Sequence, residues 1–362
     1  MNLAALKYLS LISLLLVLNI SCSSTSTDSN TNSGEIQRIE LSNGMILDVF
    51  TPANYSASQS YPLLLLNDGE IMFGSSNLRM DDIIQVLIDQ GEIEPIIAVA
   101  IHESGNRNDW YIPYDDQWIT DNWGDYEPAA DFYAETILET IIPRIEAEFN
   151  IDKEEVGILG VSLGGLVSTW MGLQYPDEIK YSAGLSGSLW AGDYEIFNDV
   201  DQTYDRGQKF WFDIGTAEWN YYVPLYEALD SAGLEPGVQS FYLEVPDGGH
   251  NRVSWLARIH QPLKVFYGLE QEIEPLRMEV VLECIPSVVT PGLNFRRMNP
   301  IITLSNDVIF SLAHAADYSL LSGSAQLGND GSFINDPSSA SRVLIEYKEF
   351  SQSLILPQGW CL

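Results

Sequence analysis

One short stretch constrains the fold of this chain more than any other: an apolar run that ends in Gly-x-Ser-x-Gly and then stays apolar at helical spacing. It covers residues 156–167, with Ser162 at the centre of the pattern. It predicts a strand, a sharp turn and a helix, and the turn would hold Ser162 in a strained conformation with its hydroxyl clear of the sheet. Gly160 and Gly164 lie where a Cβ atom would crowd that turn. The alternative is an ordinary glycine-rich turn, because the pattern alone often arises by chance.

A serine in such a turn acts as a nucleophile only with a histidine as general base and an acid that orients the histidine. His250 is the best candidate for the base, because it follows a predicted strand and two glycines late in the chain. The alternative is a histidine that only forms a turn. The other histidines fit less well, since His102 precedes the serine, His260 lies in a predicted helix and His314 lies in the C-terminal part.

Two carboxylates compete for the role of the acid. Glu218 follows the predicted strand 209–215, where a side chain can reach across to the histidine. Asp213 lies inside the apolar run of that strand, where it fits a structural group. We therefore favour Glu218 and keep Asp213 as the competitor. At the start of the helix after the serine, the backbone N–H of Leu163 would point towards a developing oxyanion.

Strands alternate with helices up to about residue 270, a pattern typical of a mostly parallel sheet with helices on both faces. Pro143 should kink the second helix because it lacks a donor N–H. The segment 102–128, rich in aromatic residues, predicts an irregular loop. Strands are predicted at 36–49 (a hairpin), 62–66, 96–101, 156–161, 181–185, 209–215 and 240–245, and helices at 80–90, 129–149 and 223–231.

Past about residue 270 the pattern changes. Apolar stretches at 278–285, 308–313 and 342–350 predict strands, because Gly, Asn, Ser and Pro separate them and no helical period is visible. We therefore expect an α/β domain over 35–270 and a small β-rich module over 275–362.

The first 22 residues predict export. Lys7 precedes an apolar run at 9–20, which is shorter than the roughly 20 residues that cross a bilayer. The run leads to Cys22, and the segment resembles a bacterial lipoprotein signal, in which the cysteine is lipidated; a plain secretory signal is the alternative. Residues 23–34 have little to bury and predict a flexible tether. We expect a cell-surface or outer-membrane lipoprotein that meets the membrane only through this anchor, or else a periplasmic or secreted protein.

An exported protein meets an oxidising compartment, which favours disulfides. Besides Cys22, the chain has two cysteines, Cys284 and Cys361. They could pair and close most of the C-terminal module. Two unrelated buried thiols are the alternative.

The charge balance excludes one class of partner. The chain has 51 acidic and 17 basic residues, which gives a formal net charge of −34. Such a charge repels nucleic acids and anionic lipid surfaces at long range, so we expect no nucleic-acid partner. The sequence contains no metal-ligand cluster and no dinucleotide-binding loop, and we therefore expect neither a metal nor another cofactor.

Several short motifs together resemble the putative esterase family of α/β-hydrolases, which includes enterochelin esterase-like proteins, feruloyl and acetylxylan esterase modules and the mycolyltransferases. The resemblance covers about 35–270 and implies an α/β-hydrolase fold. It also implies Ser162 as nucleophile, His250 as base and Glu218 as acid, although many relatives carry aspartate there. The implied oxyanion hole consists of the backbone N–H groups of Leu163 and Glu70. The motifs are Asn67-Asp68-Gly69, Arg107 before Trp110-Tyr111-Ile112-Pro113, residues 160–165, Gly215-Thr216-Ala217-Glu218 and Gly249-His250.

Other candidates for substrate contacts lie in predicted loops around the site. Arg107 could hold the aromatic loop through a carboxylate or contact substrate, and a solvated surface arginine is the alternative. Flat aromatic side chains could stack on sugar or aryl groups, or could merely pack their own loops. These aromatic candidates are Trp110, Trp118, Trp123, Trp190 and Trp219.

The function that the sequence predicts is an exported serine esterase that hydrolyses carboxylic esters through an acyl-enzyme. The expected substrate is a small-molecule or polysaccharide-linked ester, with acyl groups on polysaccharide as the first choice. One alternative is a siderophore esterase. The other is a non-catalytic glycan-binding protein on a hydrolase scaffold, since fold alone does not imply function.

Overall fold

The computed structural model describes residues 33–103, 105, 107–200, 207–218, 222–269, 272–286, 294–333 and 339–358. The segment 1–32 with Cys22, and also Trp219 and Cys361, lie outside these residues. The described residues belong to one compact unit, Ser33–Leu362. Within them, every helix is too short or too polar to span a membrane.

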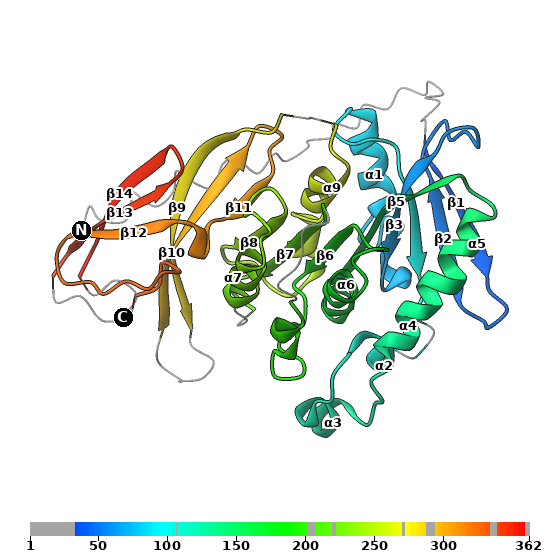
Figure 1. Ribbon diagram of the computed structural model, residues 1–362, viewed down its shortest axis with the longest axis horizontal. Helices are drawn as coiled ribbons and strands as arrows, with labels where there is room; N and C mark the ends of the chain where they lie inside the picture. The colour runs from blue at the N-terminus through cyan, green and yellow to red at the C-terminus, as the bar shows by residue number, and fades with distance from the viewer. Residues whose placement is uncertain are drawn as a thin grey trace, which may run out of the picture. The chain divides into compact units, whose positions relative to one another are not determined.

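An eight-stranded sheet organises this unit, with the strand order β1-β2-β4-β3-β5-β6-β7-β8 (Figure 1). The pairs β1–β2 and β2–β4 are antiparallel, and every other pair is parallel. The predicted mostly parallel sheet is therefore confirmed. Its strands are β1 (Glu35–Glu40), β2 (Ile46–Thr51), β3 (Tyr61–Leu66), β4 (Ile97–Ile101), β5 (Ile151–Val161), β6 (Tyr181–Leu185), β7 (Lys209–Gly215) and β8 (Ser240–Val245).

The central strands supply side chains to two cores, one on each face of the sheet. In β3, Leu63 and Leu65 join one core, while Leu64 and Leu66 join the other, and all four are fully buried. Because successive side chains of a strand point to opposite faces, a strand buried on both faces must be apolar at every position. This explains why the central strands appear in the sequence as continuous apolar runs.

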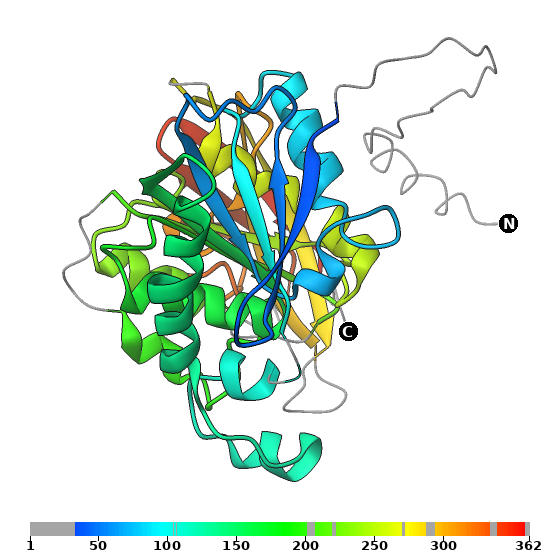
Figure 2. The same cartoon turned by 90° about the vertical axis from the view of Figure 1, so that its right-hand side faces the viewer.

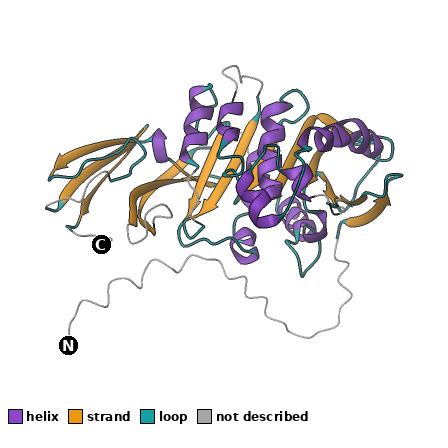
Figure 3. Ribbon diagram, turned by 90° about the horizontal axis from the view of Figure 1, so that it is seen from below, coloured by secondary structure: helices purple, strands orange, loops and turns teal. Residues whose placement is uncertain are grey.

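Helices cover both faces of the sheet (Figure 3). The helices α1 and α9 contribute to the core that contains Leu64, and α4, α6 and α7 contribute to the core that contains Leu63. The helices are α1 (Met80–Asp89), α2 (Arg107–Tyr111), α3 (Gln117–Trp123), α4 (Ala130–Thr136), α5 (Ile142–Glu146), α6 (Leu163–Gln174), α7 (Val223–Ser231), α8 (Arg252–Leu256) and α9 (His260–Tyr267).

Two helical regions differ from the prediction. Between α4 and α5 the chain forms a π-helical turn, Ile137–Ile141, and Pro143 lies in the first turn of α5. The wider turn accommodates Pro143, which lacks the backbone N–H that a regular α-helix needs as a donor. The segment 102–128, predicted as a loop, contains α2 and α3 (Figure 2). Helices of one or two turns are too short to produce a readable hydrophobic period.

The C-terminal part is rich in β-structure, as predicted, and forms two small antiparallel sheets with the orders β11-β10-β9 and β12-β13-β14. The predicted strand 342–350 consists of two strands joined by a turn, with Lys348 at φ 50°. The strands β10 and β12 were missed. The six strands are β9 (Pro275–Pro286), β10 (Asn294–Leu304), β11 (Ile309–Ser311), β12 (Asp317–Ser322), β13 (Ser341–Tyr347) and β14 (Phe350–Leu356).

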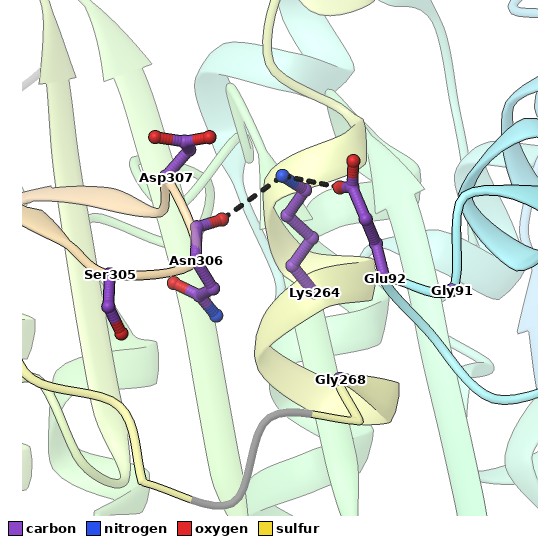
Figure 4. A pocket seen from close by; sticks show the side chains of 7 residues that line it. All are labelled: Gly91, Glu92, Lys264, Gly268, Ser305, Asn306 and Asp307. Carbon is purple, nitrogen blue, oxygen red and sulfur yellow. Dashed lines mark hydrogen bonds and ion pairs between the residues drawn. The ribbon is translucent and has the colours of Figure 1, made fainter.

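These strands share a core with the large sheet. Phe310 on β11 packs against Phe241 on β8, with the ring centroids 5.6 Å apart. On α9, the Lys264 ammonium lies 2.6 Å from the Glu92 carboxylate and donates to the Asn306 carbonyl at 3.1 Å (Figure 4). Two cavities of about 250 Å³ each lie along this joint, and the predicted site residues line neither of them.

Cys284 on β9 forms a disulfide. Its predicted partner, Cys361, lies outside the described residues, so the pairing of these two cysteines stays a prediction.

Candidate active site

The turn between β5 and α6 has the geometry of a strained elbow. Ser162 separates the last residue of β5 from the first residue of α6, with φ 58° and ψ −123°. Residues other than glycine rarely adopt a positive φ, and such backbone strain is typical of functional sites. Gly160 permits the turn, because a Cβ atom there would lie 2.3 Å from the backbone of Gly164. The Ser162 hydroxyl is thus held at the carboxyl edge of the sheet.

Three side chains that follow the strands β5, β7 and β8 form a hydrogen-bonded chain at this edge. His250 follows β8, and its Nε2 lies 3.0 Å from the Ser162 Oγ. Its Nδ1 lies 2.8 Å from Oε2 of Glu218, which follows β7. The Glu218 side chain is 1% exposed and that of His250 is 45% exposed. With the proton on Nδ1, the imidazole can accept the serine proton at Nε2.

The other oxygen of Glu218 is held from the protein side. Its Oε1 accepts hydrogen bonds from the Gly215 N–H and the Ser186 hydroxyl, both at 2.8 Å. Ser186 in turn accepts from the Arg258 guanidinium at 2.6 Å and from the Trp255 indole at 2.9 Å. Glu218 therefore has a fixed position, with Oε2 directed at the histidine.

Asp213, the competing acid, lies elsewhere in the same network. It is fully buried on β7, and its Oδ1 accepts from the Arg258 Nε at 2.8 Å and from the Ser186 N–H at 3.1 Å. Its Oδ2 accepts from the Trp211 indole at 2.9 Å. Burial raises the pKa of Asp213, and the positive charge of Arg258 opposes this rise. Of the two acids, Glu218 is the one in contact with His250.

The turn after β3 packs against the elbow from the other side. A Cβ atom on Gly164 would lie 2.8 Å from the Asp68 Oδ2, so the two turns are in close contact. The Asn67 amide donates to the Ser168 hydroxyl of α6 at 2.9 Å. Glu70 lies in the short 3₁₀ turn Gly69–Ile71 that follows. Leu163 is the first residue of α6, where backbone N–H groups have no acceptor within the helix.

Arg107, predicted to hold the aromatic segment through a carboxylate or to contact substrate, is bound to the carboxylate of that turn. Its Nε and Nη2 donate to the two Asp68 oxygens at 2.6 Å and 2.9 Å. Burial lowers the pKa of Arg107, but the hydrogen bonds to Asp68 and the negative charge of that carboxylate together with its neighbours outweigh this effect, so the pKa is raised. The backbone N–H of Asp68 also donates to the Tyr111 hydroxyl at 3.0 Å. The guanidinium fork therefore positions the turn after β3.

The predicted aromatic side chains divide into two groups. Trp110 lies in α2, is 9% exposed and stacks on Tyr133 with the ring centroids 5.4 Å apart, so it is a packing residue. Trp118 and Trp123 on α3 are 55% and 46% exposed, and both contact the half-buried Trp190. Trp219 lies outside the described residues.

Sequence reasoning missed the side chains that support the acid, namely Ser186, Trp255 and Arg258. Ser186 has φ 46°, and Arg258 is 3% exposed within a mostly apolar segment that joins α8 to α9. An arginine in an apolar segment signals a buried ionic partner, because charged side chains are rarely buried unless paired. That signal could have drawn attention to Arg258. In the part of the chain that the structure describes, no group of three or more His, Cys, Asp or Glu side chains is arranged to hold a metal ion.

Comparison with known proteins defines the class. The model of the family described as Putative esterase matches residues 40–265, more than half of the chain. This protein belongs to that esterase family, and its fold is that of the α/β-hydrolases.

Individual relatives are more distant. The uncharacterized protein YbbA of Bacillus subtilis is 28% identical over 145 residues, which cover 39% of this chain and 56% of YbbA. A solved ferulic acid esterase aligns with a TM-score of 0.52 at 17% identity, over 65% of this chain and 98% of that one. The enterobactin esterase FES of Shigella flexneri aligns with a TM-score of 0.51 at 18% identity, over 64% of this chain and 58% of that one. At these identities the solved structures show the fold and leave the substrate of this protein open.

Proposed function

We propose that this protein is a serine esterase that hydrolyses carboxylic esters through an acyl-enzyme on Ser162. One observation carries the proposal: the hydrogen-bonded chain from the Ser162 Oγ through the His250 imidazole to the buried Glu218 carboxylate. A strained elbow, a base within 3.0 Å of the serine and a fixed acid are the parts that acyl transfer requires.

Each residue has a distinct role in the proposed reaction. The Ser162 Oγ attacks the ester carbonyl while its proton moves to the Nε2 of His250. Glu218 keeps the other ring proton on Nδ1 and stabilises the imidazolium. The backbone N–H groups of Leu163 and Glu70 donate to the oxyanion. The imidazolium then gives its proton to the leaving alcohol, and a water molecule activated by the same histidine hydrolyses the acyl-enzyme.

The proposed substrate is an acyl group esterified to a polysaccharide. The similarity to a ferulic acid esterase supports this choice, and so do the exposed tryptophans of α3, which contact Trp190. A siderophore ester is the second candidate, supported by the similarity to an enterobactin esterase. The net charge of −34 makes an anionic siderophore less favourable, because it would be repelled at long range.

Export and lipidation at Cys22 complete the proposal, on the strength of the signal-like pattern of residues 1–22. If Cys22 carries the anchor, the exported protein should sediment with membranes and Cys22→Ala should release it. Equal solubility of the two forms would contradict the anchor and would leave the esterase proposal intact.

Turnover of a substrate panel tests the proposed activity. The panel contains p-nitrophenyl acetate, methyl ferulate, acetylated xylan and enterobactin, each assayed with the wild-type protein and with Ser162→Ala. We expect turnover of the simple esters and the acylated polysaccharide, and its loss in Ser162→Ala. Turnover that survives the substitution would overturn the serine mechanism. Preferential turnover of enterobactin would replace the polysaccharide ester with the siderophore.

A further inference from the structure

Three tryptophans form an exposed cluster at the carboxyl edge of the sheet. Trp118 and Trp123 project from α3, and Trp190 lies in the segment after β6. Their ring centroids are 5.4–5.8 Å apart, with interplanar angles of 73–90°. Trp118 and Trp123 are nevertheless 55% and 46% exposed. Large apolar side chains that are clustered and left in solvent mark binding surfaces more often than scattered ones do.

The cluster is built on a fixed support. One carboxylate, that of Asp116, accepts from the Ile119 N–H at 3.1 Å and from the Gly192 N–H at 2.9 Å. It therefore caps α3 and ties the helix to the segment that carries Trp190. Ile119 is fully buried beneath the helix, and the Tyr126 hydroxyl donates to the Tyr114 carbonyl at 2.6 Å. The indoles thus keep their positions without a ligand, which lowers the entropy lost on binding.

The same segment connects the cluster to the proposed nucleophile. The N–H of Ser188 donates to the carbonyl of Ser162 at 3.0 Å, and Trp190 follows two residues later. Two residues span at most about 7 Å, so Trp190 lies beside the site. The carboxylate of Glu218 is bound to Ser186, at the start of the same segment. The indole cluster and Ser162 are therefore joined through one short segment of the chain.

The negative charge around the tryptophan cluster limits the kinds of ligand that it can bind. The sequence contains no Lys or Arg over 108–143 or over 181–205, the two stretches that carry the cluster. Such surroundings repel anionic polymers and anionic lipid surfaces. The exposed acidic side chains of these stretches near the cluster are Asp115, Asp121, Asp125, Glu127, Asp193 and Glu195.

We propose that Trp118, Trp123 and Trp190 form a subsite for a neutral polysaccharide chain and hold it while its ester enters the site at Ser162. Neutral sugar rings have apolar C–H faces that pack on indoles, and they carry no charge for the acidic surroundings to repel. The inference rests on the proposed esterase function for its purpose, but binding of the chain does not require turnover.

Binding is tested with the full chain carrying Ser162→Ala, so that no ester is consumed. The ligand is soluble xylan, and its dissociation constant is measured by affinity electrophoresis. Adding Trp118→Ala and Trp123→Ala should weaken binding by about tenfold or more. Phe132→Ala is the matched control, because it also removes an exposed aromatic ring, 60% exposed on α4. That control should leave xylan affinity unchanged.

The same two substitutions are then made in the wild-type background. We expect kcat/KM for acetylated xylan to fall about tenfold through KM, with p-nitrophenyl acetate turnover unchanged. Unchanged xylan affinity in the double variant would overturn the subsite. Binding to phosphatidylglycerol vesicles instead of xylan, or a dimer that the double variant dissociates, would also overturn it. If Ser162→Ala retains turnover of p-nitrophenyl acetate, the esterase proposal fails while the xylan titration still decides the subsite.

Discussion

Two buried clusters in this protein have nearly the same composition and different surroundings. At the carboxyl edge of the sheet, Arg258 lies between Asp213 and Glu218. Where the C-terminal strands meet β8, Arg297 lies between Glu244 and Glu283. All of these side chains are at most 4% exposed. Each cluster thus pairs one guanidinium with two carboxylates inside the protein.

The two clusters differ in the residues that are hydrogen-bonded to their carboxylates. In the first cluster, Glu218 is hydrogen-bonded to His250, which is 45% exposed and therefore within reach of solvent. In the second cluster, the Asn299 amide donates to Glu283 at 2.7 Å and the Tyr242 hydroxyl donates to Glu244, and both partners are buried.

Burial imposes a desolvation cost on the charges of both clusters. The two clusters differ in the residues to which their carboxylates are bound, and hence in their roles. The first cluster orients the His250 imidazole, which contacts the Ser162 hydroxyl. The second joins the C-terminal strands to the large sheet. The following variants test this difference.

The largest expected effect is on turnover in the first cluster. Glu218→Gln keeps the shape of the side chain but removes the charge that stabilises the imidazolium, so kcat should fall by up to about 10⁴-fold. The measurement is steady-state hydrolysis of p-nitrophenyl acetate, together with a urea melt to show that the variant is folded.

Asp213→Asn is the matched control from the same strand. It should lower the free energy of unfolding by about 1–3 kcal/mol, because a buried hydrogen-bonded group has been altered. Its kcat should stay close to that of the wild type. Near-normal kcat in Glu218→Gln would reverse the assignment of the acid, and so would a loss of kcat of roughly 10³-fold or more in Asp213→Asn.

The two arginines provide the next comparison. At about pH 8, above the raised pKa of Glu283, Arg258→Met and Arg297→Met each leave two buried carboxylates without their cation, so each should lower the free energy of unfolding by about 3–5 kcal/mol. Only Arg258→Met should also lower kcat of the folded protein, because Arg258 supports Glu218 through Ser186.

Chemical denaturation and turnover are measured on the same samples. If Arg297→Met reduced kcat as much as Arg258→Met did, the two clusters would not differ in role. Arg258→Lys provides a further check, since it should restore part of the stability and alter the pH dependence of kcat.

The smallest expected effects concern the pH dependence of stability. Burial lowers the pKa of His260 to about 4, whereas the unfolded chain would titrate near 6.5. Between these values the unfolded state binds a proton that the folded state does not, so stability should fall as the pH drops from about 6.5 to 4. After allowance for partial exposure, the loss is about 1–3 kcal/mol, and His260→Gln should remove it.

Glu283 should have the opposite effect to His260 on the pH dependence of stability. Burial raises the pKa of Glu283 to about 7. The folded state then keeps a proton that the unfolded state loses above about pH 4.5, so this group makes stability fall as the pH rises towards 7. Urea midpoints from pH 4 to 7.5 separate the two contributions. Glu283→Gln should remove the second slope and leave kcat unchanged, and a large loss of kcat would contradict a purely structural role.

The fold and part of the site could be predicted because their signals are local. The elbow around Ser162 is encoded by two glycines and two apolar runs, and the strands are continuous apolar runs buried on both faces. The positions of Glu218 and His250 follow from strand ends that meet at one edge of a parallel sheet.

The remainder depends on contacts between distant residues. Arg258 lies 45 residues from Asp213 and 72 from Ser186, and no local pattern indicates that they meet. A carboxylate partner for Arg107 could be predicted, but not its identity, because Asp68 is 39 residues away and only the folded chain brings the two together. The helices α2 and α3 are too short to produce a period, so their tryptophans could not be divided into packing and exposed groups.

The central claim, that the first cluster activates Ser162 as a nucleophile, is tested most directly by covalent trapping. The full chain is incubated with a fluorophosphonate, and the adduct is located by intact mass and peptide mapping. We predict one adduct per chain, on Ser162, with loss of ester turnover in proportion to labelling and much slower labelling in Glu218→Gln. Stoichiometric labelling at another residue, or full turnover by protein labelled on Ser162, would contradict the claim.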